Sequence, residues 1–261
     1  MLAMPIRIGV QIQPQQADFA QMRKAWGEAE ELGVDAIYTW DHFYPLYGDP
    51  DGKHFEGTTS LTALAAATEQ VKIGALVFCN SYRNPQLLAN IHSTIDHLSG
   101  GRVVLGIGAG WFERDYDEYG YEFGTAPERL RALGRDLPLI EERLAKLNPP
   151  PVGEIPIMIG GAGEKVTLKL VAKHAKLWHT FADPETYLRK AAVLAEHCER
   201  IGRDPNEIER VIGAHAPILG YADTLADAGV QELTVGVGGG ADGSYDLGEV
   251  RELLQWRDAR G

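Results

Sequence analysis

The sequence is poor in cysteine, with two such residues, Cys79 and Cys198, in 261. They stand far apart and outside any paired motif, so we expect neither a disulfide framework nor a cysteine metal site. Apolar runs long enough to cross a bilayer are lacking, and no apolar segment follows a basic region as in a signal peptide. These absences predict a soluble, cytoplasmic protein with no membrane partner.

Positive charge is also scarce. The chain has 25 Lys and Arg against 37 Asp and Glu, which gives a formal net charge of -12. Such a balance repels nucleic acid and anionic membrane surfaces, and no basic tract offsets it. We therefore expect no nucleic-acid partner. The hydrophobic content of 44% is ordinary for a globular α/β protein.

A strand–helix–strand unit is the clearest local pattern. Asn84 is a favourable N-cap, Pro85 suits the first helical turn, and apolar residues follow at helical spacing as far as Leu98. Short apolar runs at 73–78 and 103–107 flank this helix. They suit strands that are covered on both faces and therefore pair in parallel.

The same alternation runs through the whole chain. Strands are expected at 6–12, 36–40, 73–78, 103–107, 155–159, 176–181, 211–214 and 232–237. Helices are expected at 18–32, 58–69, 85–98, 127–147, 164–174, 184–201, 224–228 and 245–259. Eight strands alternating with eight helices predict an α/β fold, a single (β/α)8 TIM-barrel domain over 1–261.

Working residues of such a barrel stand at the C-terminal ends of its strands. Asp41 and His42 follow the second strand, where a histidine can pass a proton near neutral pH and a carboxylate can orient the ligand or the ring. A structural role is the alternative for any one histidine. Glu56, in the same aromatic loop, could face the pocket too. His179 and His215, at other strand ends, stay open.

Two familiar barrel chemistries are disfavoured. Gln11 and Gln13 at the end of the first strand are neutral amides, which bind catalytic metals poorly, so no metal is expected. The lysine nearest a strand end, Lys165, lies beyond a glycine turn, so imine chemistry is also disfavoured.

Two groups of glycines have alternative interpretations. Gly106, Gly108 and Gly110 share one face of the fourth strand. They indicate either tight packing inside a closed barrel or a flat ligand against bare backbone. The run Gly160, Gly161, Ala162 and Gly163, followed by Lys165, indicates either a phosphate site or a simple strand-to-helix turn.

Several blocks resemble the luciferase-like monooxygenase superfamily, and within it the branch that uses coenzyme F420, a deazaflavin. They are IRIGVQ, AEELGVDAIYTWDHF, IGALVFCNSYRNPQLLAN, DHLSGGRVVLGIGAGW, IPIMIGGAGEKVTLKLVAKHA and EHCERIGRDP. The resemblance covers most of the chain in the expected order. It implies a bacterial luciferase-like barrel that transfers a hydride between coenzyme F420 and a small organic substrate. FMN-dependent monooxygenation is one alternative, and a non-catalytic ligand-binding barrel is a second.

The resemblance also implies roles for individual residues. It places a non-prolyl cis peptide within 76–79, between Val77 and Phe78, behind the cofactor ring. Asp41 and His42 would lie beside the reactive ring, with His42 as proton donor. The further residues implied for the cofactor are Asn80, Ala109, Gly110, Gly160, Gly161, Ala162, Gly163, Lys165 and Thr180. The candidates for the substrate are Gln13, Glu56 and Trp111.

Partners and substrate follow in the same way. A homodimer is expected through the helices after strands one to three, and an enzyme that reduces the F420 or flavin is a possible partner. The segment after Gly110 lacks the acidic residue that the family's sugar-phosphate dehydrogenases have there, so a sugar phosphate is not expected as substrate.

Overall fold

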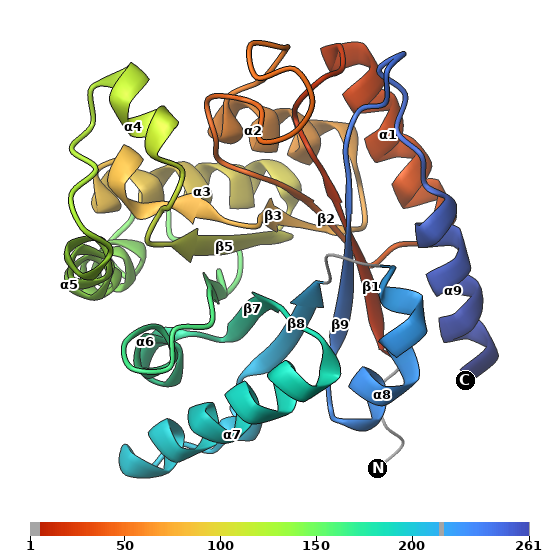
Figure 1. Cartoon of the computed structure of the whole chain (residues 1–261). Helices are drawn as coiled ribbons and strands as arrows, with labels where there is room; N and C mark the ends of the chain where they lie inside the picture. Colours follow the sequence, from red (N-terminus) through yellow and green to blue (C-terminus); the bar gives the residue numbers. More distant parts are fainter. Residues whose placement is uncertain (1–5, 214–216, 261) are drawn as a thin grey trace.

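The computed structural model describes residues 6–213 and 217–260 (Figure 1). Its strands are β1 (Arg7–Ile12), β2 (Ala36–Thr39), β3 (Lys72–Ala75), β4 (Phe78–Cys79), β5 (Val103–Gly108), β6 (Ile157–Gly160), β7 (Leu177–Phe181), β8 (Glu209–Gly213) and β9 (Glu232–Val237). Its α-helices are α1 (Phe19–Leu32), α2 (Gly57–Ala67), α3 (Pro85–Ser99), α4 (Glu113–Tyr119), α5 (Ala126–Leu144), α6 (Thr167–His174), α7 (Pro184–Arg200), α8 (Ala222–Asp227) and α9 (Gly248–Arg260). Short 3-10 turns are η1 (Asn80–Tyr82), η2 (Pro205–Glu207) and η3 (Ile218–Tyr221).

The strands close into a barrel in which all pairs are parallel. β3 and β4 both pair with β5, so together they occupy one strand position of the barrel, interrupted between them. From β5 the order runs through β6, β7, β8, β9 and β1 back to β2 and β3, which gives eight strand positions. Figure 1 shows the helices around the outside of the strands. The predicted (β/α)8 barrel is confirmed.

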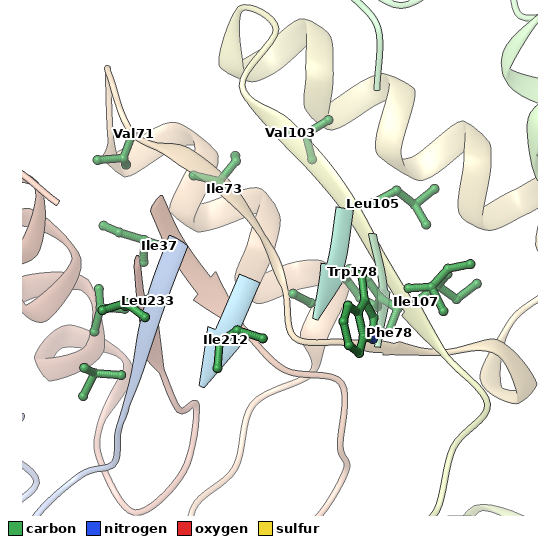
Figure 2. Packing of buried hydrophobic residues seen from close by; sticks show 14 of the residues in the cluster. Ile37, Val71, Ile73, Phe78, Val103, Leu105, Ile107, Trp178, Ile212 and Leu233 are labelled. Carbon is green, nitrogen blue, oxygen red and sulfur yellow. The ribbon is translucent and has the colours of Figure 1, made fainter. Parts of the chain in front are cut away.

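Alternate strand residues face the helices and form the main core. Ile37, Ile73, Leu105, Ile212 and Leu233 are all fully buried in it, as Figure 2 shows. Burying an aliphatic side chain of this size stabilises the fold by about 1.5–3 kcal/mol. The strands are apolar along their whole length because helices cover the outer face of the sheet and the inner face is buried inside the barrel.

A second cluster, which includes Tyr38, Met158 and Leu177, fills the barrel interior toward the N-terminal ends of the strands. Beneath it Glu232 accepts hydrogen bonds from the Tyr38 hydroxyl (2.8 Å) and from Arg7 Nε (3.2 Å). Because side chains close this end, room for a ligand lies at the opposite end, where the strands finish.

Helix boundaries follow the signals in the sequence. Asn84 Oδ1 accepts from the backbone N–H groups of Gln86 (2.9 Å) and Leu87 (3.2 Å) at the start of α3. Gly100, with φ +68°, ends the same helix. None of the helices in the described ranges is long and apolar enough to span a membrane.

The structure departs from the sequence predictions in three places. The third strand is interrupted by a cis peptide between Leu76 and Val77, within the expected stretch but one residue before the expected bond. Helix α4 occupies a segment for which no helix was predicted, and α6 begins at Thr167 instead of near 164. His215 and the end of the strand predicted at 211–214 lie outside the described residues.

Candidate active site

A cavity of about 500 Å³ lies at the C-terminal ends of β2 to β7. Ten of the residues to which the sequence gave a catalytic, cofactor or substrate role line it: Asp41, His42, Val77, Phe78, Ala109, Gly110, Trp111, Gly160, Gly161 and Thr180. Gly108 and His179, which the sequence left open, line it too. The strand ends of the predicted barrel therefore do meet around one pocket.

The other candidates lie away from the cavity wall. Asn80 is buried and donates from Nδ2 to Asp136 Oδ2 at 2.8 Å. Glu56 caps α2 by accepting from two backbone N–H groups. Lys165 is exposed and precedes α6. Gln13, Ala162 and Gly163 are likewise outside the lining residues.

His42 stands at the cavity with its ring held from behind. Its Nδ1 lies 2.7 Å from Asp115 Oδ2, and the His42 side chain is 13% exposed. The rings of Trp111 and Phe112 flank it, with centroids 5.7 and 5.5 Å away. The histidine is therefore fixed between a buried carboxylate and an aromatic wall.

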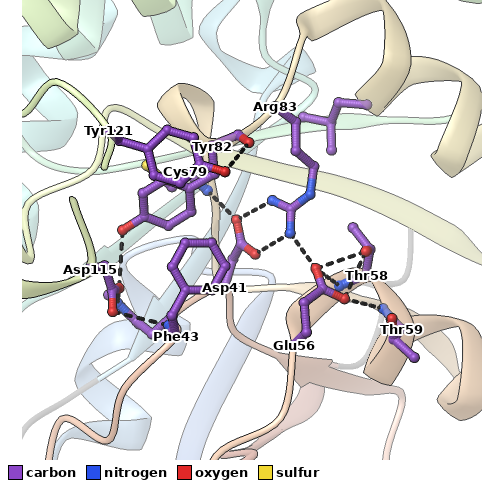
Figure 3. A network of polar contacts seen from close by, with 12 residues as sticks. Asp41, Phe43, Glu56, Thr58, Thr59, Cys79, Tyr82, Arg83, Asp115 and Tyr121 are labelled. Atoms are coloured by element: carbon purple, nitrogen blue, oxygen red, sulfur yellow. Dashed lines mark hydrogen bonds and ion pairs between the residues drawn. The ribbon is translucent and has the colours of Figure 1, made fainter. Parts of the chain in front are cut away.

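Asp41 has a different partner. Arg83 donates to both carboxylate oxygens of Asp41 at 2.7 Å, and the backbone N–H of Cys79 donates to Oδ2 at 2.9 Å (Figure 3). Arg83 also donates to Glu56 at 2.5 Å. Asp41 thus ties the loop after β2 to η1 and the end of β4, while a separate carboxylate orients His42.

The surroundings of Glu56 and Arg83 shift the pKa values of both groups. Burial alone would raise the pKa of Glu56, but hydrogen bonds from the backbone of Thr59 and Thr58 lower it to about 2. Burial opposes the charge of Arg83, yet the neighbouring Asp41 raises the pKa of Arg83 above its ordinary value. Both Glu56 and Arg83 are therefore charged at neutral pH.

The glycines around the cavity leave room for Val77. A Cβ at Gly108 or Gly160 would lie 2.8 Å from a methyl carbon of Val77, closer than such atoms approach. A Cβ at Gly106 would lie 2.0 Å from the carbonyl oxygen of Ala75. Gly106 therefore serves barrel packing, whereas Gly108 and Gly160 allow the Val77 side chain to line the pocket.

Buried His179 and half-buried His54 are neutral. Burial lowers the pKa of His179 to about 4, and its Nε2 has no hydrogen-bond partner within the described residues. Burial likewise lowers the pKa of His54 to about 4, and His54 Nε2 accepts from Trp40 Nε1 at 3.0 Å. His179 lines the cavity from β7, which is four strand positions around the barrel from β2, so it lies on the wall opposite His42.

Sequence reasoning missed part of the wall and the partner of His42. Arg129, Leu130 and Leu133 of α5 and Thr167 of α6 line the cavity. The apolar stripe of α5 indicated that a face was buried but not that it borders a pocket. Asp115 gave no signal, because an acidic residue among tyrosines is usually exposed.

Comparisons with known proteins identify the family of the chain. A model of the family described as luciferase-like monooxygenase matches residues 1–254. The chain therefore belongs to the luciferase-like monooxygenase family, and the resemblance in the sequence is confirmed at that level. The F420-dependent glucose-6-phosphate dehydrogenase of Microbacterium testaceum (strain StLB037) is 28% identical over 232 residues, which are 81% of this chain and 68% of the relative.

Solved structures share the fold. An F420-dependent secondary alcohol dehydrogenase in complex with an F420-acetone adduct superimposes with a TM-score of 0.79 at 18% identity, over 89% of this chain and 93% of that one. The coenzyme F420-dependent tetrahydromethanopterin reductase from Methanopyrus kandleri gives 0.73 at 16% identity, over 96% and 98%. Both are barrels of the same architecture.

Proposed function

We propose that this protein is an oxidoreductase that moves a hydride between coenzyme F420 and a small organic substrate. The observation that carries the proposal is the cavity in which Val77 stands against Gly108 and Gly160 while His42 lines the same space. A flat ring suits a wall made of backbone and one apolar side chain, and a proton-transferring group beside it suits hydride transfer. The names of the relatives support F420 over FMN as the cofactor.

The residues present fit this coenzyme. Val77, Gly108 and Gly160 would hold the ring, together with Ala109 and Gly110. A phosphate would lie at the start of α6, where Gly161 and Thr167 line the cavity and backbone N–H groups favour an anion. Bound there, the coenzyme supplies hydride transfer, and the chain supplies orientation and a proton at His42.

Arg129 takes the place that the sequence gave to Lys165. Its guanidinium borders the cavity, with Nε donating to the Gly110 carbonyl at 3.1 Å and Nη1 to the Phe123 carbonyl at 2.9 Å. These bonds fix the cation in position, so its charge favours the phosphate without loss of side-chain freedom on binding.

The coenzyme assignment is tested by titrating the protein with coenzyme F420 and, separately, with FMN. We expect tight binding of F420 and much weaker binding of FMN. Tight binding of FMN and none of F420 would reverse the choice and favour a flavin-dependent monooxygenase supplied by a separate reductase. Failure of both to bind would favour a non-catalytic barrel.

The substrate we propose is an uncharged alcohol or ketone. Among the described residues that line the cavity, Arg129 is the cation, and Asp41 is the acid and is neutralised by Arg83. Trp111, 63% exposed beside His42, offers an apolar platform. With F420 bound, we expect turnover of a secondary alcohol such as 2-propanol. Turnover of glucose 6-phosphate and not of neutral alcohols would contradict this assignment.

We also propose that the protein is a homodimer in the cytoplasm and that a partner enzyme reduces its coenzyme. The surface between α2 and α3 is an apolar groove, and Leu87 and Leu98 beside it are 52% and 51% exposed. Two copies could bury these side chains against each other. Light scattering should give a dimer for the native chain and a monomer for Leu98→Glu. A native monomer would refute the dimer without touching the chemistry.

A further inference from the structure

Asp115 is a buried carboxylate whose role no motif in the sequence suggests. It lies on α4, outside the strand ends, and its side chain is 0% exposed. Oδ1 accepts from the backbone N–H groups of Phe43 (3.0 Å) and Tyr44 (3.1 Å). Oδ2 accepts from the Tyr82 hydroxyl at 3.0 Å and lies 2.7 Å from His42 Nδ1. A carboxylate satisfied by this many donors is held in one orientation.

These contacts determine where His42 carries its proton. Both oxygens of Asp115 act as acceptors, so the hydrogen in the contact with His42 belongs to Nδ1. The neutral ring then has no hydrogen on Nε2. His42 lines the cavity, and within the described chain Nε2 has no hydrogen-bond partner of its own. The free lone pair is therefore available to a ligand.

We propose that Asp115 is the positioning residue for His42. It fixes the ring and the tautomer so that Nε2 accepts a proton from the substrate, and its charge stabilises the imidazolium that forms. In the oxidation of an alcohol, the hydroxyl proton would pass to Nε2 and the hydride on the carbon that bears the hydroxyl would pass to the oxidised coenzyme, which leaves the ketone. In the reverse direction the same Nε2–H donates to the carbonyl oxygen.

The inference rests on the proposed function for its chemistry but not for its geometry. Asp41 precedes His42 in the sequence, yet its oxygens are bound by Arg83 and the Cys79 N–H. Asp115, 73 residues after His42, holds the ring instead. The two carboxylates are thus distinct, and substitution of Asp115 leaves the Asp41 ion pair in place.

The test replaces Asp115 by an amide of the same shape. In Asp115→Asn the remaining carbonyl oxygen can still accept from the backbone of Phe43 and Tyr44, while the NH₂ group faces Nδ1 and the Tyr82 hydroxyl. Nδ1 must then accept, so the hydrogen moves to Nε2. Nitrogen NMR of histidine-labelled protein, without coenzyme or substrate, reports which ring nitrogen carries it.

Controls separate this effect from loss of structure. His42→Gln identifies the signal, and Tyr82→Phe removes one donor to Asp115 and should leave the Nδ1–H tautomer unchanged. In Asp115→Asn the Tyr82 hydroxyl must turn its hydrogen away to accept from the new NH₂ group. The double variant Tyr82→Phe with Asp115→Asn removes that requirement, which keeps the test usable if the single variant folds poorly.

We expect Nδ1–H in the native protein, Nε2–H in Asp115→Asn, and turnover of 2-propanol lowered by about 100-fold or more. The dissociation constant for coenzyme F420 should stay within about twofold, because Asp115 does not line the cavity. A native Nε2–H tautomer, or an unchanged tautomer in Asp115→Asn, would overturn the inference. Absence of F420 binding with the native Nδ1–H signal present would instead refute the proposed function and leave the role of Asp115 intact.

Discussion

Replacing Arg83 by methionine should destabilise the protein strongly, because it leaves Asp41 buried without its cation. The Asp41 side chain is 0% exposed and that of Arg83 is 11% exposed, and both contacts between them are 2.7 Å. Removing one partner of such a pair costs about 3–5 kcal/mol, since an uncompensated buried charge remains. Glu56, 38% exposed, can turn toward water and adds little to this loss.

The assay is urea unfolding followed by tryptophan fluorescence. With an m-value of about 3 kcal/mol/M, Arg83→Met should lower the midpoint by about 1–2 M. The double variant Arg83→Met with Asp41→Asn removes the stranded charge and should be about 2 kcal/mol more stable than Arg83→Met alone.

The matched control is Arg200→Met, which breaks an ion pair between side chains that are 63% and 61% exposed. Pairs of that kind contribute about 0.5 kcal/mol or less. Equal losses for Arg83→Met and Arg200→Met, or a double variant no more stable than Arg83→Met, would refute the assignment of Asp41 as a buried structural ion.

Three further predictions concern stability. Gly106→Ala places a Cβ 2.0 Å from a backbone oxygen and should cost about 3 kcal/mol or more in urea unfolding, whereas Gly108→Ala meets a methyl group at 2.8 Å, costs less, and weakens F420 binding. Gly27→Ala, with nothing within 4 Å, should stabilise α1 by about 0.5–1 kcal/mol, and a loss there would contradict the geometry. Burial lowers the pKa of His92 and of His179 to about 4 in the folded protein. As the pH falls, both therefore bind protons in the unfolded chain before they do so in the folded one. Stability should therefore fall as the pH drops from about 6.5 to 4, by about 2.7 kcal/mol per pH unit for the two together. His54, whose pKa is also lowered to about 4, adds about 1.4 kcal/mol per pH unit, so His92→Leu should reduce the total slope by about a third.

The barrel was predictable because its signals are local and repeated. Continuous apolar strands, helix caps such as Asn84 and terminal glycines such as Gly100 each act within a few residues, and together they specify the order of elements. Because working residues of such a barrel stand at the C-terminal ends of its strands, Asp41, His42 and Gly160 were expected near one another, and all three line the cavity. None of these steps needed the packing of distant segments.

The contacts of those residues were not predictable, because they join segments far apart in the chain. Arg83 reaches Asp41 across 42 positions and Asp115 reaches His42 across 73. The sequence placed an acid beside His42, and proximity along the chain suggested that the two act together. Lys165 stands two residues before α6 and does not line the cavity, whereas Arg129, a cation on another helix, does.

The two carboxylates anchor the loop that carries His42 at different points. Asp41 binds the Cys79 N–H, which joins the loop after β2 to the end of β4, and Asp115 binds the Phe43 N–H, which joins the same loop to α4. Tyr82, next to Arg83, donates to Asp115, so both networks meet at η1. A shift of η1 would therefore move both anchors of the loop at once. Substitutions in η1 should then alter proton transfer at His42 and the Val77 side of the cavity together, whereas Asp115→Asn on α4 should alter proton transfer alone.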